Sequence, residues 1–375
     1  MKMWHAAAVA LAGVMAIGGC TDPNPAFQGG PELPDECRAG EETVEVMEGF
    51  ERPDRLDIWV LVRDAGASVS YQEALASAME PALLEWEEDY DIRVGVSTMS
   101  TDSGPGLAPV VDDVEGCEDN GRQVARSGRD GWQEVVGCNI QQGSDGERRS
   151  RPLDVIEASL LDDPSSLDGF RRDDARLMIL MASNQDDCSG SDFDDDPDSP
   201  ARDLCAWQSD DLKQVEAVVE GLQESATAAR GGVSVAAISG PPTRVNYEEG
   251  EVVRSVCQST LGSSYPAPRL FEMAAMMGRD GHFDSSCVFD LDGAMATVDR
   301  RLVSDDEVVL CTEEPMAHEP LEVLAVDGDG EQRAMTVGED LTIIGASQGC
   351  PDGGIAANSR GDWAPASIEI TYCAL

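Results

Sequence analysis

Between residues 51 and 305, short apolar segments alternate with longer segments whose apolar residues recur at helical spacing. The segment 176–181 (RLMILM) is apolar on both faces, which is typical of a central strand in a parallel sheet. Further strands are expected at 56–62, 92–96 and 233–238, and helices at 69–87, 152–161, 209–228, 268–277 and 289–302. This alternation predicts a three-layer α/β domain with a mostly parallel sheet.

The other segments have different patterns. Residues 100–150 are polar and rich in glycine and aspartate, so we expect a long loop or hairpin there, and 184–205 is an acidic insertion. After residue 305 only short strands are expected, at 307–310, 321–326, 334–337, 341–344 and 368–372, with a hairpin turn at 327–330. Residues 306–375 are therefore predicted to form a small C-terminal β module, stapled by disulfides of Cys311, Cys350 and Cys373.

The first residues have the pattern of an export signal. Lys2 precedes an apolar segment at 6–17 that is too short to span a bilayer stably. The segment ends in the letters IGGC at Cys20, which resemble a bacterial lipobox. We expect residues 1–19 to be cleaved as a lipoprotein signal peptide, Cys20 to carry diacylglycerol and a further acyl chain such as palmitate, and residues 20–50 to form a flexible tether.

A lipid anchor predicts a location in the bacterial cell envelope, at the outer membrane or the cell surface, with membrane contact through the anchor only. An ordinary secretory signal that happens to contain a cysteine is the alternative.

Cysteine usage agrees with export. The chain has 11 cysteines, and an even number remains once Cys20 is set aside for the lipid. Exported chains meet oxidising conditions, so disulfides are expected, and the absence of a C-x-x-C motif argues against a redox centre or a zinc ribbon. Spacing favours the local pairs Cys188–Cys205, Cys117–Cys138 and Cys257–Cys287.

The chain is strongly acidic, with 73 acidic and 26 basic residues and a net charge of −47. Nucleic acid is therefore excluded as a partner, because phosphate binding needs a basic surface. Direct docking on anionic lipid headgroups is excluded for the same reason. The acidity fits either attraction of cations or a basic partner, or simply a well-solvated surface, and we favour the second interpretation.

Several segments together resemble one known family. The apolar strand at 56–62, followed by residues 64–68 (DAGAS) and a long helix, is similar to the Asp-x-Ser-x-Ser start of von Willebrand factor A (vWA) domains. Three later features resemble vWA-like bacterial lipoproteins of the myxobacterial type: the strand and acidic turn at 177–189, the strand at 233–238 with Gly240-Pro241 after it, and the helix start Pro268-Arg269-Leu270. The resemblance covers residues 55–305 and implies a vWA/Rossmann-like fold.

In vWA domains these loops build a metal-ion-dependent adhesion site, where oxygen ligands hold Mg²⁺ and an open position takes a carboxylate from the partner. The resemblance places Asp64, Ser68 and Asn184 at positions of this site. Gly66 stands where a serine hydroxyl is expected, Asn184 stands where a second aspartate is expected, and Arg63 adds a positive charge. We predict a degenerate site, and we prefer the hypothesis that Asp64 and Ser68 only cap the next helix over the hypothesis that they still bind metal.

A second set of oxygen ligands lies in the acidic insertion, at Asp192, Asp194, Asp196 and Asp198. Carboxylates spaced along a loop can chelate Ca²⁺, which tolerates irregular geometry, but the EF-hand spacing is missing. A solvated acidic loop is the favoured interpretation. The sequence requires no cofactor, and Mg²⁺ or Ca²⁺ are the ions that these two sets of residues would bind.

The sequence has no H-E-x-x-H, P-loop or dinucleotide-binding motif. His282 follows Gly281 in an expected loop, as a surface or packing residue. We therefore expect a non-enzymatic, envelope-anchored module that binds an envelope or extracellular protein, with no small-molecule substrate identified. The alternatives are a structural scaffold whose contacts are made by the β module, and an enzyme of unrecognised type.

Overall fold

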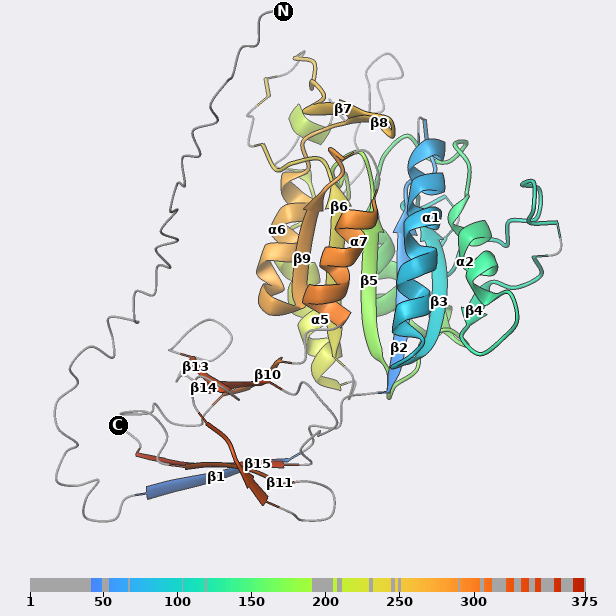
Figure 1. Ribbon diagram of the computed structural model, residues 1–375. Helices are drawn as coiled ribbons and strands as arrows, with labels where there is room; N and C mark the ends of the chain where they lie inside the picture. Colours follow the sequence, from blue (N-terminus) through green and yellow to red (C-terminus); the bar gives the residue numbers. More distant parts are fainter. Residues whose placement is uncertain are drawn as a thin grey trace, which may run out of the picture. The chain divides into compact units, whose positions relative to one another are not determined.

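The computed structural model describes residues 42–48, 54–66, 68–102, 104–118, 120–190, 205–207, 211–228, 232–243, 247–248, 251–288, 291–303, 307–311, 322–326, 332–336, 341–344, 354–358 and 367–373 (Figure 1). The chain divides into two compact units. One unit comprises residues 51–307, and the other combines residues 1–50 with 308–375.

A six-stranded sheet forms the centre of the unit 51–307. Across the sheet the strands are β4 (Val124–Arg126), β3 (Asp91–Thr98), β2 (Arg55–Val62), β5 (Arg176–Ala182), β6 (Val233–Ser239) and β9 (Gly281–Ser285). Neighbouring strands run parallel, except that the edge strand β4 is antiparallel to β3. The predicted α/β class with a mostly parallel sheet is confirmed.

Helices cover both faces of this sheet (Figure 1). One face carries α1 (Val69–Trp86), α2 (Trp132–Ile140) and α7 (Asp292–Val298), and the other carries α3 (Pro152–Ile156), α5 (Val215–Ala228) and α6 (Pro268–Met276). Each face has its own apolar core, because successive strand residues point to opposite sides. In β2, for example, Ile58 packs in the first core and Trp59 in the second.

Three elements of this unit depart from the prediction. Residues 100–150 contain α2 and β4 instead of only a loop, since Trp132, Val136 and Ile140 form a buried stripe at four-residue spacing. His282 lies in β9, not in a loop; this edge strand is half-buried along its length and lacks the apolar segment that marks a central strand. Helix α5 begins at Val215 and not at 209, because Leu212 forms a β-bridge with Gly190.

All three predicted disulfides are present: Cys117–Cys138, Cys188–Cys205 and Cys257–Cys287. The last of them links the hairpin of β7 (Cys257–Ser259) and β8 (Gly262–Ser264) to the segment that follows β9.

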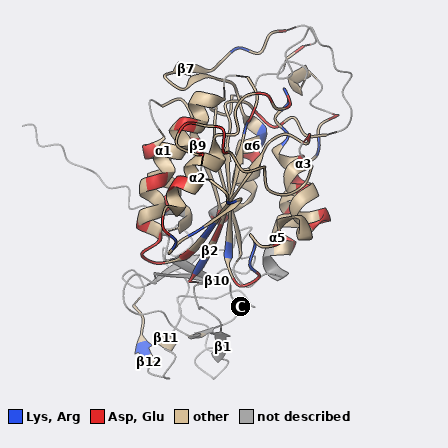
Figure 2. Cartoon of the chain, turned by 90° about the vertical axis from the view of Figure 1, so that its right-hand side faces the viewer, with Lys and Arg blue, Asp and Glu red and all other residues tan. Residues whose placement is uncertain are grey.

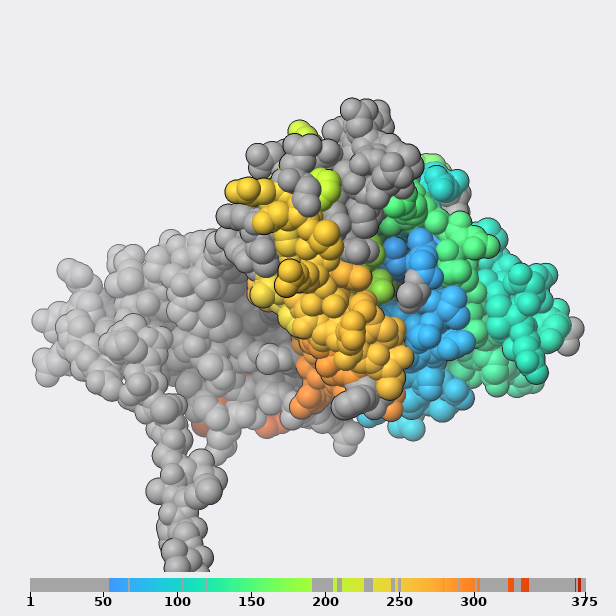
Figure 3. Space-filling view, turned by 90° about the horizontal axis from the view of Figure 1, so that it is seen from above, coloured from blue at the N-terminus to red at the C-terminus, as the bar shows by residue number. Residues whose placement is uncertain are grey.

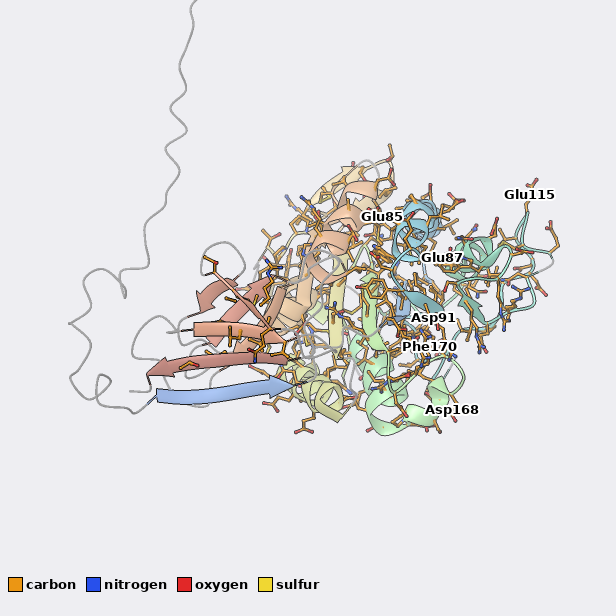
Figure 4. The ribbon with its side chains drawn as sticks, turned by 60° about the horizontal axis from the view of Figure 1, so that its bottom comes forward. Glu85, Glu87, Asp91, Glu115, Asp168 and Phe170 are labelled. Carbon is orange, nitrogen blue, oxygen red and sulfur yellow. A yellow bond between two sulfur atoms is a disulfide. The ribbon has the colours of Figure 1, made fainter. Side chains whose placement is uncertain are left out.

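Arg172 forms two ion pairs at the edge of the sheet where the parallel strands begin, one with the buried Asp57 and one with the exposed Asp91. Arg172 holds Asp57 with an Nη2–Oδ1 distance of 2.7 Å and Asp91 with an Nη1–Oδ2 distance of 2.5 Å. Burial raises the pKa of Asp57, and Arg172 partly offsets this. Figure 4 labels Asp91 and Phe170 at this edge, where Arg93 donates to the Phe170 carbonyl at 3.3 Å. The groups here satisfy one another, so this edge is structural.

The second unit contains two small sheets, the first of which is antiparallel throughout. The first has β1 (Glu42–Glu48), β15 (Ser367–Cys373), β11 (Glu322–Val326) and β12 (Gln332–Ala334), in that order, and the second has β10 (Glu307–Cys311), β14 (Gly354–Asn358) and β13 (Leu341–Ile344). The hairpin expected around 327–330 is confirmed by the antiparallel pairing of β11 with β12, but its second strand was expected at 334–337 and lies at Gln332–Ala334. Cys350 lies outside the described residues, so the disulfide staple stays a prediction.

The predicted tether is shorter than expected. Residues 20–50 were expected to be a tether, but Glu42–Glu48 form β1, which pairs antiparallel with β15 along its whole length. The β unit is thus built from both ends of the chain, and a tether would have to end before residue 42. The segment TVEV alternates polar and apolar residues as a half-buried strand does, but the prolines and glycines before it obscured the pattern.

Candidate ligand-binding site

The strand order reverses between β2 and β5, whose carboxyl ends lie side by side. Chains of this topology bind ligands in the crevice at such a reversal. Asp64 follows β2 and Asn184 follows β5, so the fold brings these two predicted site residues to the same edge. Figure 3 looks down on this edge, where the yellow and orange atoms of the β6–α7 part of the chain lie beside α1 in blue.

Asp64 is held inside the protein, with 7% of its surface exposed. A Cβ atom added to Gly146 would come within 2.1 Å of the Asp64 Oδ2 atom, so the carboxylate lies directly against this glycine. Burial raises the pKa of Asp64, while its own backbone N–H, the Thr98 hydroxyl and the charge of Arg63 act in the opposite direction. A carboxylate packed in this way has no open side for a metal and its water shell.

The cation of this site is the guanidinium of Arg63. Its Nη1 donates to the Ala65 carbonyl and, at 3.4 Å, to Oδ1 of Asn184, and its Nη2 donates to the Arg148 carbonyl at 3.4 Å. A Cβ atom at Gly66 would lie 3.6 Å from Nη1, so the guanidinium passes beside the position where the family has a serine. Arg63 therefore brings a permanent positive charge to oxygens of both loops.

Residues 143–148, which we call the covering segment, close the site from above. Ser68 Oγ donates to the Gly143 carbonyl at 3.1 Å, and the side chain of Gln72 exchanges two hydrogen bonds with Gly143, at 2.8 and 3.0 Å. Gly146 N donates to the Asp64 carbonyl at 2.8 Å, and Asp145 forms a β-bridge with Ala65. The Ser68 hydroxyl and the Asp64 carbonyl thus form hydrogen bonds with the covering segment.

The structure also corrects the preferred hypothesis of helix capping. Ser68 occupies the N-cap position of α1, but its side chain makes no capping hydrogen bond and turns to Gly143 instead. Within the described part of the chain, no group of three or more His, Cys, Asp or Glu side chains is arranged to hold a metal ion. At the positions that the vWA resemblance assigns to the site, Asp64 lies against Gly146, Ser68 donates to Gly143 and Asn184 accepts from Arg63. Asp192, Asp194, Asp196 and Asp198 lie outside the described residues.

An open cavity of about 740 Å³ lies at the same edge, next to the loop that follows β5. Its wall comes from this loop, from α6 and from the segments before and after β7 and β8. The lining residues are Arg149, Ser150, Gln185, Asp186, Asp187, Cys188, Cys205, Ala206, Leu212, Pro242, Thr243, Tyr247, Val253, Tyr265, Pro266, Pro268, Arg269, Phe271, Glu272, Ala275 and Met276. A cavity of this volume suits a small ligand or a few side chains of a partner.

Two adjacent aspartates stand in the wall of this cavity with different surroundings. Asp187 is 1% exposed, and its Oδ2 receives both Nε and Nη2 of Arg269 at 3.0 Å. Asp186 accepts the backbone N–H groups of Arg269 and Leu270, at 3.1 and 3.2 Å, and so caps α6. Burial and the neighbouring Asp187 raise the pKa of Asp186 to about 7, against the lowering effect of these hydrogen bonds and of Arg269.

No role was predicted from the sequence for the pair Asp186 and Asp187. Residues 184–205 were treated as one acidic insertion, although Asp186 and Asp187 follow the most apolar strand of the chain directly. Their position after a central parallel strand was the available signal, because that end of the strand faces the ligand edge. The aromatic and apolar wall from α6 and from the segments around β7 carries no sequence pattern that links it to this loop.

No family model matches the chain, and no curated protein matches it. Among solved structures, the proximal thread matrix protein 1 of the mussel byssus aligns at 14% identity and a TM-score of 0.32, covering 70% of this chain and 50% of that one. The pilus adhesin SpaC of Lactobacillus rhamnosus GG aligns at 12% identity and a TM-score of 0.36, covering 88% and 40%. The adhesive tip pilin GBS104 of Group B Streptococcus agalactiae aligns at 10% identity and a TM-score of 0.33, covering 89% and 80%.

This chain spans half or less of the length of the first two of these proteins. Similarity at this level assigns no family, so the function has to be argued from the site itself. Among the helices of the described residues, none is both long and apolar enough to cross a membrane.

Proposed function

We propose that this chain is a non-enzymatic binding protein of the bacterial cell envelope, lipid-anchored through Cys20, that recognises an envelope or extracellular protein without a metal ion. The observation that supports the proposal most is the open cavity beside Arg63 and the covering segment, which lie at the positions that the vWA resemblance gives to the adhesion site. The vWA-like resemblance of the sequence supports a binding role. Metal-mediated capture of a partner carboxylate is not available to a closed site.

A photo-crosslinking experiment tests this proposal. A photoreactive amino acid replaces Ala275, an exposed residue of α6 that lines the cavity, and a control carries it at Leu84, an exposed residue of α1. The anchored protein is irradiated in intact cells of its source, with and without a chelator of divalent cations.

The proposal predicts one discrete crosslinked protein from position 275, absent from position 84 and unchanged by the chelator. Absence of a crosslink at 275, or its loss in the chelator, would contradict the proposal.

A further inference from the structure

We infer that the cavity beside α6 receives a basic side chain of the protein partner, an arginine or lysine flanked by apolar residues, with Asp186 as the group that recognises its charge. This inference rests on the proposed function and gives its ligand a chemical class. Its support comes from the different hydrogen bonds of the charged groups in the cavity wall, from the exposed apolar side chains around them and from the volume of the cavity.

The Asp186 carboxylate is the acceptor that a basic side chain would meet. The hydrogen bonds described for it come from the backbone N–H groups of Arg269 and Leu270, and each of its oxygens can accept further bonds. Asp187 differs, because the guanidinium of Arg269 already neutralises it with two hydrogen bonds. A cation entering the cavity would therefore complete an ion pair with Asp186 and leave the Asp187–Arg269 pair intact.

The same contacts disfavour an anionic ligand. The backbone N–H groups at the start of α6, which would be the natural anion site, already donate to Asp186. Arg269 donates hydrogen bonds from Nε and Nη2 to Asp187, and Nη2 also donates to the carbonyl of Lys213. Arg149 and Glu272 also line the cavity, so its wall contains acids and bases, but the whole chain carries a net charge of −47, which attracts basic partners.

The rim of the cavity provides apolar contact for the rest of the ligand. Phe271 is 43% exposed and Met276 is 36% exposed, which is unusual for large apolar side chains on one short helix. Phe271 is held in place by an edge-on contact with Phe283 of β9, with ring centroids 5.5 Å apart. A fixed aromatic ring near a carboxylate suits the apolar stem and charged head of arginine in particular.

The test uses blocked tripeptides as probes of the purified, disulfide-intact protein. The first is acetyl-Leu-Arg-Leu-amide, the second replaces arginine by the neutral isostere citrulline, and the third is arginine amide alone. Binding is followed by the shifts of amide resonances in nuclear magnetic resonance spectra, which also show where each probe binds.

Three variants sharpen the test. Asp186→Asn keeps an oxygen that can cap α6 but removes the charge. Ala275→Trp narrows the cavity from an exposed position on α6 and leaves the Asp186 residue unchanged, and Leu84→Trp is the matched control on α1. Thermal unfolding of each variant confirms that it folds.

We expect the arginine tripeptide to bind at least about tenfold more tightly than the citrulline tripeptide and than arginine amide, since a charge-assisted hydrogen bond and the apolar flanks each contribute. Asp186→Asn should reduce arginine binding to the citrulline level, and Ala275→Trp should abolish it, while Leu84→Trp leaves it unchanged. Equal binding of arginine and citrulline tripeptides, or no effect of Asp186→Asn, would overturn the inference, and so would equally tight binding of arginine amide.

The two proposals fail separately. A metal-independent crosslink at position 275 without any preference for arginine would leave the proposed function standing and refute the basic-ligand assignment. Loss of the crosslink together with arginine preference in the tripeptides would refute protein capture at this site, and the cavity would then bind basic groups for another purpose.

Discussion

Arg63 and Asp186 illustrate how single residues decide the character of this binding edge. Arg63 lies among oxygens of the loops that follow β2 and β5, and its guanidinium keeps its charge at physiological pH. Asp186 is a carboxyl whose charge is disfavoured by burial. The first residue gives the site a permanent positive charge, and the second leaves the neighbouring cavity with an acidic group that a ligand can stabilise.

The raised pKa of Asp186 predicts a pH dependence of stability. In the folded chain this carboxyl has a pKa of about 7, whereas the ordinary pKa of an aspartate is 3.8. Between these values the folded state binds more protons than the unfolded state, so the free energy of unfolding falls as the pH rises through this interval. Asp186→Asn removes this loss, and its free energy of unfolding should exceed that of the wild type at pH 8 but not at pH 4.

Urea unfolding at a series of pH values measures this difference, with Asp211→Asn, at an exposed carboxylate, as the control. A constant offset between Asp186→Asn and the wild type across the pH range would show that the carboxyl of Asp186 has an ordinary pKa.

At the scale of elements, what could be predicted depends on how completely an element is buried. Strands β2, β5 and β6 are apolar on both faces and were expected close to their observed bounds. The edge strand β9 is half-buried and β1 follows a segment rich in prolines and glycines, so neither has a clear apolar pattern and neither was predicted. Asp64 and Asn184 each follow a predicted strand, but the strand order that brings them to the same edge is known only from the structure.

The closure of that site did not follow from the sequence. The covering segment acts through the backbone atoms of Gly143, Ser144 and Gly146, and backbone hydrogen bonds leave no pattern in the side chains. The glycine at 146 is required because the Asp64 carboxylate occupies the space of a Cβ atom. The cavity was missed for a similar reason, since its wall joins segments more than 80 residues apart, as in the contact of Asp186 with Arg269.

The disulfides give a prediction at this scale. In the chain-entropy model, the Cys188→Ser/Cys205→Ser double variant should lose about 3 kcal/mol of stability, because a bridge over 17 residues restricts the unfolded chain. The Cys257→Ser/Cys287→Ser double variant releases a separation of 30 residues and should lose about 0.5 kcal/mol more.

Unfolding in urea under non-reducing conditions measures both losses. Unchanged midpoints in either double variant would mean that the bridge does not contribute through the unfolded chain.

At the scale of the whole molecule, charge and cysteine usage agree with the export expected from the sequence. Acidic residues lie on helices on both sides of the sheet (Figure 2), and such an acidic chain is expected to disfavour nucleic acid and anionic lipid. Three disulfides in one unit fit the same environment. Attachment to the envelope is then expected to come from the lipid on Cys20, which lies outside the described residues.

The lipid anchor has a direct test. In the wild type, metabolic labelling with a tagged palmitate should mark the protein, and mass spectrometry should place the mature N-terminus at Cys20. Cys20→Ala should remove the label and release the exported protein from the membrane fraction. Labelling of the Cys20→Ala variant, or a mature N-terminus elsewhere, would support the ordinary secretory signal instead.

We propose that Arg63 and the covering segment exclude a metal ion from the positions of the adhesion site implied by the resemblance, so that the protein binds its partner without metal. Calorimetric titration of the lipid-free, disulfide-intact protein with Mg²⁺ and Mn²⁺ tests this claim most directly, with an Asp64→Ala variant beside it. We expect the wild type and Asp64→Ala to give the same titration, with no heat of Mg²⁺ or Mn²⁺ binding that is lost in the variant. Saturable Mg²⁺ or Mn²⁺ binding to the wild type that disappears in Asp64→Ala would contradict it, because the metal would then have displaced Arg63 from oxygens that the account assigns to the chain.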